Sequence, residues 1–332
     1  MSPLPEGSPL WISEAEVTQA MSLAEAIGVL EAGLKAEAAG KALNMEKTHV
    51  AWEGSNLHAI GAVFTDAAIA GTKTWAHTPG GATPLLALFD SHKGNLLAVI
   101  EAFALGQLRT GGISGVATKY LAAPDASELA VIGTGKQAFP QVAAVAAVRP
   151  IKRVRIYSPT KEKREAFAQK LREKLFLEVM VSDSVEAAVA GAPIVTLVTR
   201  AKEPFLKAAH LAKGAHVNAV GAITAEREEF AQDVFARASH LAADAVEPLA
   251  RLSKEFMRQF GEGRGDWKKI EPLCQVAAEG MGRQAGDDLT VFKALGVGIS
   301  DLSLGIEILA RARERGLGHA FPHPRRGELR LR

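Results

Sequence analysis

The spacing of hydrophobic and polar positions changes along the chain and predicts different structures in its first third. Apolar residues recur at helical intervals over 21–39, after a Ser13–Glu16 pair with the spacing of a helix capping box. Between residues 48 and 101, short apolar runs are broken by glycines and by a turn-like stretch at 90–94, which predicts a small, largely antiparallel sheet. Residues 105–121 return to a helical spacing despite several glycines, so we expect close packing or a ligand along that helix.

Beyond residue 127, short apolar runs alternate with helix-compatible segments. The expected strands are 129–132, 154–157, 178–181, 194–198, 216–220 and 241–243, and the expected helices are 139–148, 160–175, 184–190 and 205–211. This alternation predicts an α/β fold with a doubly wound parallel sheet. The segment 289–313 also has a helical pattern, and we expect it to return to the first domain.

A glycine-rich turn lies between the first strand and the first helix of this alternation. It reads G-x-G-x-x-A, as Gly133, Thr134, Gly135, Lys136, Gln137 and Ala138. Gly133 permits a tight turn, Gly135 lets a pyrophosphate approach the backbone, and the small Ala138 lets the helix pack closely on the strand. The free N–H groups at the helix start would face the phosphates, so the segment predicts a dinucleotide site.

The end of the second expected strand favours NADP(H), with NAD(H) still possible. An acidic residue there would bond the ribose 2′-hydroxyl of NAD, but this chain has Ser158. Thr160, Lys161 and Arg164 follow, and hydroxyl and cationic groups suit a 2′-phosphate. We expect Lys163, on the same helix, to be an exposed charge without such a role.

Length and composition indicate the general class of the protein. A length of 332 residues favours two domains, and 48% hydrophobic with 23% charged residues is typical of soluble globular proteins. The net charge of +2 gives no reason to expect nucleic acid. No run of about 18 apolar residues and no leader-like start is present, so we expect a cytoplasmic protein without a membrane partner. The single Cys274 lies in an apolar context typical of a structural thiol, and no metal site is expected.

Three side chains of the first domain are candidates for substrate chemistry. Lys73 lies in an apolar strand, where a cation could hold a carboxylate or deliver a proton to a nitrogen. Arg109 lies among small residues and could grip a carboxylate with two parallel hydrogen bonds, or form a salt bridge between domains. His58 could contact substrate, although an isolated histidine is more often structural.

Several motifs together resemble the ornithine cyclodeaminase/μ-crystallin family over about residues 40–318. They are GTK at 71–73, LRTGGISGVATKYLA at 108–122, VIGTGKQA at 131–138, KGAHVNAVGA at 213–222 and DLTVFKALGVGISDL at 288–302. The resemblance implies a Rossmann NAD(P)-binding domain at 123–302. It also implies an α+β substrate-binding and dimerisation domain, built from 1–122 with 303–332, in a homodimer.

The resemblance also assigns expected roles. Lys73 matches the family lysine at the substrate and is the leading proton donor, with His58 a weaker one. Arg109 matches the arginine that holds the carboxylate, and Lys47 falls where an arginine is usual. Thr83 is expected to line the substrate pocket. The remaining residues expected at the cofactor are Thr199, Val220, Gly221 and Leu295.

One departure from the family pattern bears on the reaction. The cyclodeaminases have an aspartate where this chain has Ile223, which cannot serve as acid or base. We therefore expect an NAD(P)H-dependent imine or ketimine reductase, closest to the μ-crystallin-like members, acting on a small carboxylate-bearing imine. The alternatives are an alanine-type amino-acid dehydrogenase, then an ornithine cyclodeaminase, and, outside enzymes, an NADPH-dependent binding protein for a small ligand.

Overall fold

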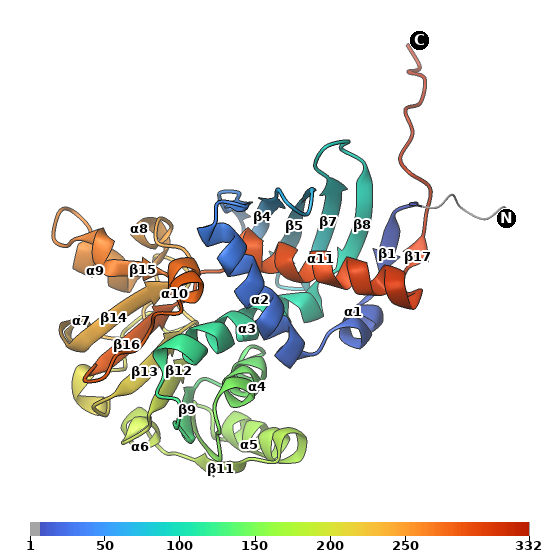
Figure 1. The fold of residues 1–332 in the computed structure, drawn as a ribbon. Helices are drawn as coiled ribbons and strands as arrows, with labels where there is room; N and C mark the ends of the chain where they lie inside the picture. Colours follow the sequence, from blue (N-terminus) through green and yellow to red (C-terminus); the bar gives the residue numbers. More distant parts are fainter. Residues whose placement is uncertain (1–6, 332) are drawn as a thin grey trace. The chain divides into compact units, whose positions relative to one another are not determined.

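The computed structural model describes residues 7–331, which divide into two units (Figure 1). Part of the N-terminal stretch inspected for a leader, residues 1–6, lies outside the described residues. Unit 1 takes the N-terminal residues through Ser22, Ala39–Gly106, and the chain from Val297 onward. Unit 2 takes Leu23–Ala38 and Gln107–Gly296. Unit 1 is thus built from both ends of the chain, as expected for the second domain.

Unit 1 contains a nine-stranded mixed sheet in which most neighbouring strands are antiparallel. The strand order is β17-β1-β8-β7-β5-β4-β2, with β3 paired to β4 and β6 paired to β5. The strands are β1 (Leu10–Ile12), β2 (Ala42–Asn44), β3 (Thr48–Trp52), β4 (Ser55–Phe64), β5 (Ile69–Thr78), β6 (Gly81–Ala82), β7 (Leu85–Asp90), β8 (Leu96–Glu101) and β17 (His319–Ala320). The antiparallel sheet expected from residue 48 onward is therefore confirmed.

Helices α1 (Glu14–Ala20) and α11 (Gly298–Arg315) belong to unit 1. The expected capping box is present at the start of α1, between Ser13 and Glu16. Helix α11 packs closely on the sheet because its contact points are glycines. A Cβ on Gly298 would lie 1.9 Å from the carbonyl oxygen of Gly61, and one on Gly305 would lie 2.4 Å from Leu86. This close contact brings the α11 side chains against β4, β5 and β7.

Unit 2 contains an eight-stranded parallel sheet in the order β11-β10-β9-β12-β13-β16-β14-β15. The strands are β9 (Glu128–Ile132), β10 (Arg153–Tyr157), β11 (Glu178–Val181), β12 (Ile194–Leu197), β13 (Ala215–Ala219), β14 (Ala238–Ala243), β15 (Ile270–Pro272) and β16 (Leu289–Lys293). The strand order reverses between β9 and β12, which is the point where a doubly wound sheet binds its ligand. The predicted Rossmann architecture is confirmed.

The helices of unit 2 cover this sheet. They are α2 (Leu23–Ala38), α3 (Phe103–Leu121, from Gln107 on), α4 (Ala138–Val148), α5 (Lys161–Leu175), α6 (Val185–Val189), α7 (Asp233–Arg237), α8 (Leu249–Leu252), α9 (Lys254–Phe260) and α10 (Leu273–Glu279), with single 3-10 turns η1 (Ala208–His210) and η2 (Trp267–Lys269). The helix expected at 205–211 is thus reduced to η1. Both α2 and most of α3 fall in unit 2, whereas the expected boundary at residue 122 placed them with the other domain.

Close helix packing accounts for three glycines of α3, which are Gly111, Gly112 and Gly115. A Cβ on Gly111 would lie 2.8 Å from the carbonyl oxygen of Pro140 in α4. A Cβ on Gly112 or on Gly115 would collide with Leu30 or with Ile27 of α2. The packing that the sequence predicted along this helix is therefore present within unit 2.

The expected helix over 289–313 is wrong in its first part. Residues Leu289–Lys293 form β16, a strand between β13 and β14, and the helix begins only at Gly298. Every residue of β16 is buried. A strand covered on both faces shows no polar alternation, so its apolar run has the same appearance as a buried helix segment.

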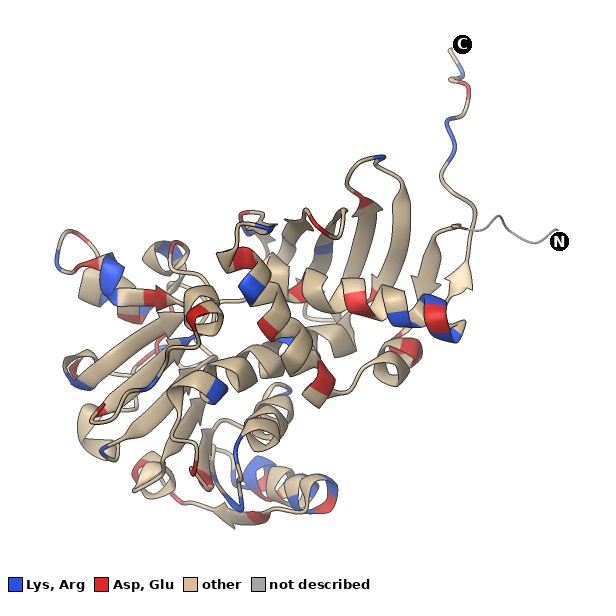
Figure 2. Cartoon of the chain, viewed as in Figure 1, with Lys and Arg blue, Asp and Glu red and all other residues tan. Residues whose placement is uncertain are grey.

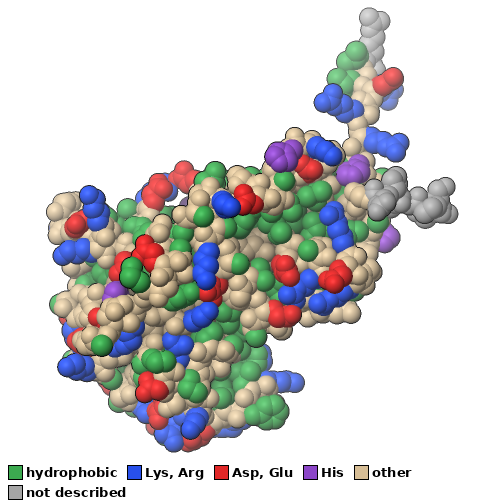
Figure 3. Space-filling view, in the orientation of Figure 1, with side chains coloured by type: hydrophobic (Ala, Val, Ile, Leu, Met, Phe, Trp, Pro, Cys, Tyr) green, Lys and Arg blue, Asp and Glu red, His purple; other side chains and the backbone are tan. Residues whose placement is uncertain are grey.

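Charged side chains are distributed without a strong sign bias. Figure 2 shows lysines, arginines and acidic residues mixed along α5, while the strands of the sheets are largely free of charge. On the face drawn in Figure 3, side chains of both signs are interspersed among the described residues. No helix in the described part of the chain is both long and apolar enough to cross a membrane.

Candidate functional site

The glycine turn after β9 has the geometry that a pyrophosphate requires. Gly133 has φ +115°, and a Cβ there would lie 2.6 Å from the carbonyl oxygen of Val198 at the end of β12. Only glycine fits, because the turn passes directly over the neighbouring strand. A Cβ on Gly135 would meet no atom within 4 Å, so the space before it is open, and Ala138 is fully buried where α4 begins. These residues fit a bound dinucleotide.

Beside this turn is a hollow of about 340 Å³ with several lysines. It lies between the turn and α5, and its lining includes Thr134, Lys136, Lys163 and Lys170. Lys170 also lies over the ring of Phe139, 4.5 Å from the centroid. Lys163, which we expected to be an exposed charge without a role, thus lines the same hollow as the glycine turn. Gln137 is the residue immediately before α4.

The residues after β10 take different positions. Ser158 is buried at the strand end, whereas Thr160 and Lys161 are exposed. Arg164 is buried and donates from Nη1 to the carbonyl oxygen of Ser182 at 3.1 Å, and its guanidinium lies over the ring of Tyr157. The Arg164 guanidinium is therefore engaged in joining α5 to the end of β11, a role that its sequence position did not indicate.

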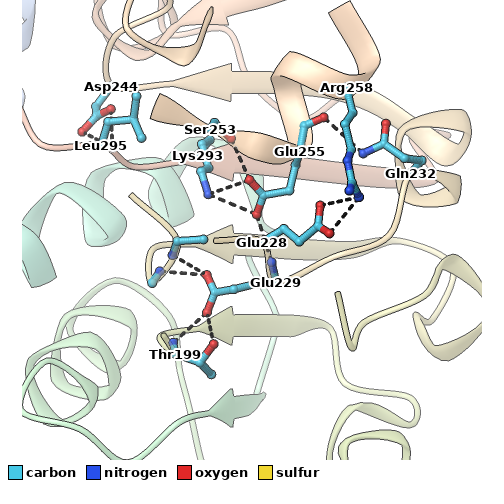
Figure 4. Close-up of polar contacts among 12 residues, drawn as sticks. Thr199, Glu228, Glu229, Gln232, Asp244, Ser253, Glu255, Arg258, Lys293 and Leu295 are labelled. Carbon is cyan, nitrogen blue, oxygen red and sulfur yellow. Dashed lines mark hydrogen bonds and ion pairs between the residues drawn. The ribbon is translucent and has the colours of Figure 1, made fainter. Parts of the chain in front are cut away.

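The expected nicotinamide-side residues follow the carboxyl ends of parallel strands. Thr199 follows β12, Val220 and Gly221 follow β13, and Leu295 follows β16. Asp244, directly after β14, is buried and accepts hydrogen bonds from the backbone N–H of Leu295 at 2.9 Å and of Gly296 at 2.7 Å (Figure 4). Nothing in the local sequence indicated Asp244, because its partners lie some fifty positions further along the chain.

Arg109, in the part of α3 that belongs to unit 2, contacts the same loop. Gly296 has φ +83°, and a Cβ there would lie 2.4 Å from Nη1 of Arg109. The guanidinium therefore lies against the bare backbone of the loop that Asp244 holds. Within unit 2, the candidate carboxylate-binding group and a candidate nicotinamide-side loop are neighbours.

In unit 1, Lys73 is buried and paired with an aspartate. Its side chain lies on the face of β5 that packs against α11, and Nζ forms an ion pair with Oδ1 of Asp301. The pair is almost completely buried, with side-chain exposures of 4% and 0%. Asp301 was missed as a site residue because it lies 228 positions from Lys73 in the sequence. Burial of a lone ammonium is costly, and the carboxylate of Asp301 offsets that cost for Lys73.

Trp75 contacts two of the expected groups of unit 1, Lys73 and His58. Nζ of Lys73 lies 5.1 Å from the Trp75 ring centroid, and His58 stacks on the same residue with centroids 4.7 Å apart. Burial, together with the nearby cation of Lys47, lowers the pKa of His58 to about 4. His58 is therefore neutral at pH 7 and is a poor proton donor there. Trp75 itself was not singled out from the sequence.

Two other positions that the sequence singled out are Thr83 and Ile223. Thr83 is exposed in the loop after β6. Ile223 is partly buried and packs against the hydrophobic core of unit 2. The position that carries an aspartate in cyclodeaminases is thus used here for packing.

Comparison with known proteins shows relatives over most of the chain. A Delta(1)-pyrroline-2-carboxylate reductase of Bacillus cereus is 34% identical over 236 residues, which is 70% of this chain and 72% of the relative. The ketimine reductase mu-crystallin of Rattus norvegicus is 31% identical over 65% of each chain.

The fold is shared with a solved structure. Delta(1)-pyrroline-2-carboxylate reductase of Thermococcus litoralis, in complex with NADH and L-proline, matches with a TM-score of 0.88 and 26% identity, covering 94% of this chain and 100% of that chain. The sequence profile of the ornithine cyclodeaminase/mu-crystallin family matches residues 9–316. The chain belongs to the ornithine cyclodeaminase/mu-crystallin family.

Proposed function

We propose that this protein is an NAD(P)H-dependent reductase of a small imine that carries a carboxylate, such as pyrroline-2-carboxylate or piperideine-2-carboxylate. The observation that carries the proposal is the buried Lys73–Asp301 pair of unit 1, which supplies an oriented cation. Unit 2 of the same chain has a glycine turn whose geometry suits a dinucleotide. Relatives named as reductases of pyrroline-2-carboxylate and of ketimines support the same reaction class.

Each group of the site has a role in this reaction. The reduced nicotinamide, when bound, supplies the hydride that the imine carbon accepts. Lys73 donates the proton that the imine nitrogen takes up as C=N becomes CH–NH, and solvent returns a proton to the lysine. Asp301 keeps the ammonium of Lys73 oriented and balances its charge. The neutral His58 orders the aromatic surroundings of Lys73 by stacking on Trp75.

Arg109 binds the substrate carboxylate. Its planar guanidinium offers two parallel donors, which fixes the orientation of the carboxylate as well as its position. Lys47 contributes a second positive charge without that planar geometry. Holding the carboxylate sets the neighbouring imine carbon in place, and such positioning supplies a large part of catalysis in hydride-transfer enzymes.

The cofactor in this proposal is NADP(H) rather than NAD(H). Ser158 stands at the end of β10, where a carboxylate would repel a 2′-phosphate. The hollow beside the glycine turn adds Lys136 and Lys163, whose charges complement the same phosphate.

We also propose that the protein forms homodimers through unit 1. All residues of β3 are exposed. Large apolar side chains are exposed on and beside this strand at Leu43, Met45, Val50, Trp52 and Leu57. Contiguous exposed apolar side chains are typical of a surface that a partner covers, and a second copy brings the same surface.

The test of the function follows the absorbance of NADPH, and of NADH in parallel, with purified protein. We expect consumption with pyrroline-2-carboxylate or piperideine-2-carboxylate, and faster consumption of NADPH. Reaction only with L-alanine and oxidised cofactor would indicate the amino-acid dehydrogenase instead. Ammonia release from ornithine would indicate the cyclodeaminase. Tight NADPH binding without turnover of any of these substrates would overturn the reductase proposal and favour a binding protein.

A further inference from the structure

Glu229 is a fully buried carboxylate surrounded by hydrogen-bond donors. Its Oε1 accepts from the backbone N–H of Thr199 at 2.6 Å and from the Thr199 hydroxyl at 2.8 Å. Its Oε2 accepts from the backbone N–H groups of Gly221 at 2.8 Å and Ala222 at 3.0 Å. Both oxygens thus hold two donors each, an arrangement that suits the ionised carboxylate (Figure 4).

These donors come from two loops that follow neighbouring parallel strands. Thr199 follows β12, and Gly221 with Ala222 follows β13. In a doubly wound fold the glycine turn and the first strands bind the adenosine half of a dinucleotide, and the strands beyond the reversal bind the other half. Glu229 therefore joins the two backbone segments that border the nicotinamide half of the predicted cofactor site.

The local backbone is adapted to this contact. A Cβ on Gly221 would lie 2.2 Å from the backbone nitrogen of Thr199 and 2.5 Å from Oε1 of Glu229. Any side chain at residue 221 would separate the two loops and displace the carboxylate. The absence of a side chain at Gly221 is thus a requirement of the Glu229 contact as well as of the loop.

Glu229 is itself held by a buried network. Its backbone N–H donates to Oε1 of Glu255 at 3.0 Å, and Glu255 pairs with Lys293 at the end of β16 at 3.4 Å. Ser253 donates its hydroxyl to the other oxygen of Glu255 at 2.7 Å. Burial raises the pKa of Glu229, whereas Lys293 and the hydrogen bonds from Thr199 oppose that shift.

The adjacent glutamate makes different contacts. Glu228 is also buried, but it pairs with Arg258 at 2.8 Å and with Lys254 at 3.1 Å, and its carboxylate makes no contact with Thr199, Gly221 or Ala222. Figure 4 shows the two neighbouring carboxylates pointing in different directions. Glu228 is therefore a matched control for a buried charge without contact to the strand-end loops.

We propose that Glu229 is a positioning residue for the nicotinamide half of the cofactor, acting by fixing the Thr199 and Gly221–Ala222 loops. This inference rests on the proposed function for the identity of the cofactor. It assigns Glu229 no contact with substrate and no proton transfer. Its effect on the cofactor passes through the two loops alone.

The test compares Glu229→Gln with Glu228→Gln in the full-length protein, using two ligands. NADPH occupies both halves of the site, whereas 2′,5′-ADP occupies only the adenosine half. An amide at 229 presents an NH2 group to backbone N–H donors, so the Glu229→Gln protein loses at least one of its loop hydrogen bonds. We expect its Kd for NADPH to rise about tenfold or more, with the Kd for 2′,5′-ADP changed less than about twofold. The fluorescence of bound NADPH should also shift, because it reports on the nicotinamide surroundings.

The outcomes separate a positioning role from a purely structural one. Glu228→Gln should lower the melting temperature while leaving both Kd values unchanged. Equal loss of NADPH and 2′,5′-ADP affinity in Glu229→Gln, or no loss of either, would overturn the proposal. If Glu229→Gln does not fold, Thr199→Val removes the hydroxyl that donates to Glu229 and accepts from the backbone N–H of Ala201 at 3.2 Å, and a smaller but equally selective loss of NADPH affinity is then expected. Wild-type protein that binds NADPH but reduces no imine would overturn the proposed function while leaving this test intact.

Discussion

Lys73 is the side chain on which the proposed chemistry most depends. Because it is buried with Asp301, replacing it alone changes the stability of the protein as well as its catalysis. Lys73→Met leaves the Asp301 carboxylate buried without its lysine, which we expect to cost about 3 kcal/mol of the free energy of unfolding. The same variant should lose about 10²-fold or more in kcat, because the proton donor is gone. Denaturant unfolding and steady-state kinetics measure the two effects.

The double variant Lys73→Met/Asp301→Asn separates the loss of stability from the loss of kcat. It removes both charges, so most of the stability should return while kcat stays low. Binding of NADPH should remain close to wild type in both variants. Recovery of kcat together with stability would show that Lys73 serves structure and not proton transfer.

Arg109 offers a test of carboxylate binding. Arg109→Lys keeps the charge but loses the planar pair of donors, so we expect KM for the imine to rise about tenfold with a smaller change in kcat. A substrate analogue without the carboxylate should react equally slowly with both proteins. An unchanged KM would place the carboxylate at another cation, of which Lys47 is the first candidate.

Among the strands, β13 carries a histidine that should make stability depend on pH. His216 is fully buried between Thr290 and Asn218, and burial lowers its pKa from 6.5 to about 3. The folded state keeps His216 neutral while the unfolded chain takes up a proton, so stability is lost as pH falls below 6.5. The loss is about 1.4 kcal/mol per pH unit down to about pH 3.

This dependence can be measured against a variant without the titrating group. Between pH 7 and pH 5, urea unfolding of wild-type protein should show about 2 kcal/mol of destabilisation from His216. His216→Gln is less stable at pH 7 because it packs differently, but its stability should change less between the two pH values. Equal pH dependence in the two proteins would contradict a neutral buried His216.

The hollow between the glycine turn and α5 tests cofactor preference. Lys136→Glu and Lys163→Glu place negative charge where we propose the 2′-phosphate binds, so each should raise the Kd for NADPH about tenfold. The Kd for NADH should change much less, since it lacks that phosphate. A parallel loss of both affinities would place these lysines at the pyrophosphate, and no loss would remove the hollow from the cofactor site.

For the whole molecule, the exposed apolar surface of unit 1 predicts its assembly. Trp52→Glu places a charge on that surface, and we expect sedimentation to show monomers where the wild type gives dimers. Phe176→Glu is the matched control, because Phe176 is a single apolar side chain, 89% exposed, on unit 2. A monomeric wild-type protein, or dimers in both variants, would contradict the proposed interface.

Local sequence determined much of this protein. The G-x-G-x-x-A turn, the strand and helix alternation around it and the capping box before α1 depend on neighbouring residues, so their patterns are readable without a structure. Local patterns also indicated Lys73 and Arg109, because a cation in an apolar strand or among small residues is unusual.

Tertiary structure alone decided the rest, because the deciding partners are distant in sequence. Burial on both faces made Leu289–Lys293 a strand, although its apolar run has a helical pattern. The pairing of Lys73 with Asp301, and of Glu229 with two strand-end loops, exists only once the sheets and helices have packed. Buried charges need partners to offset their desolvation, and the fold selects those partners.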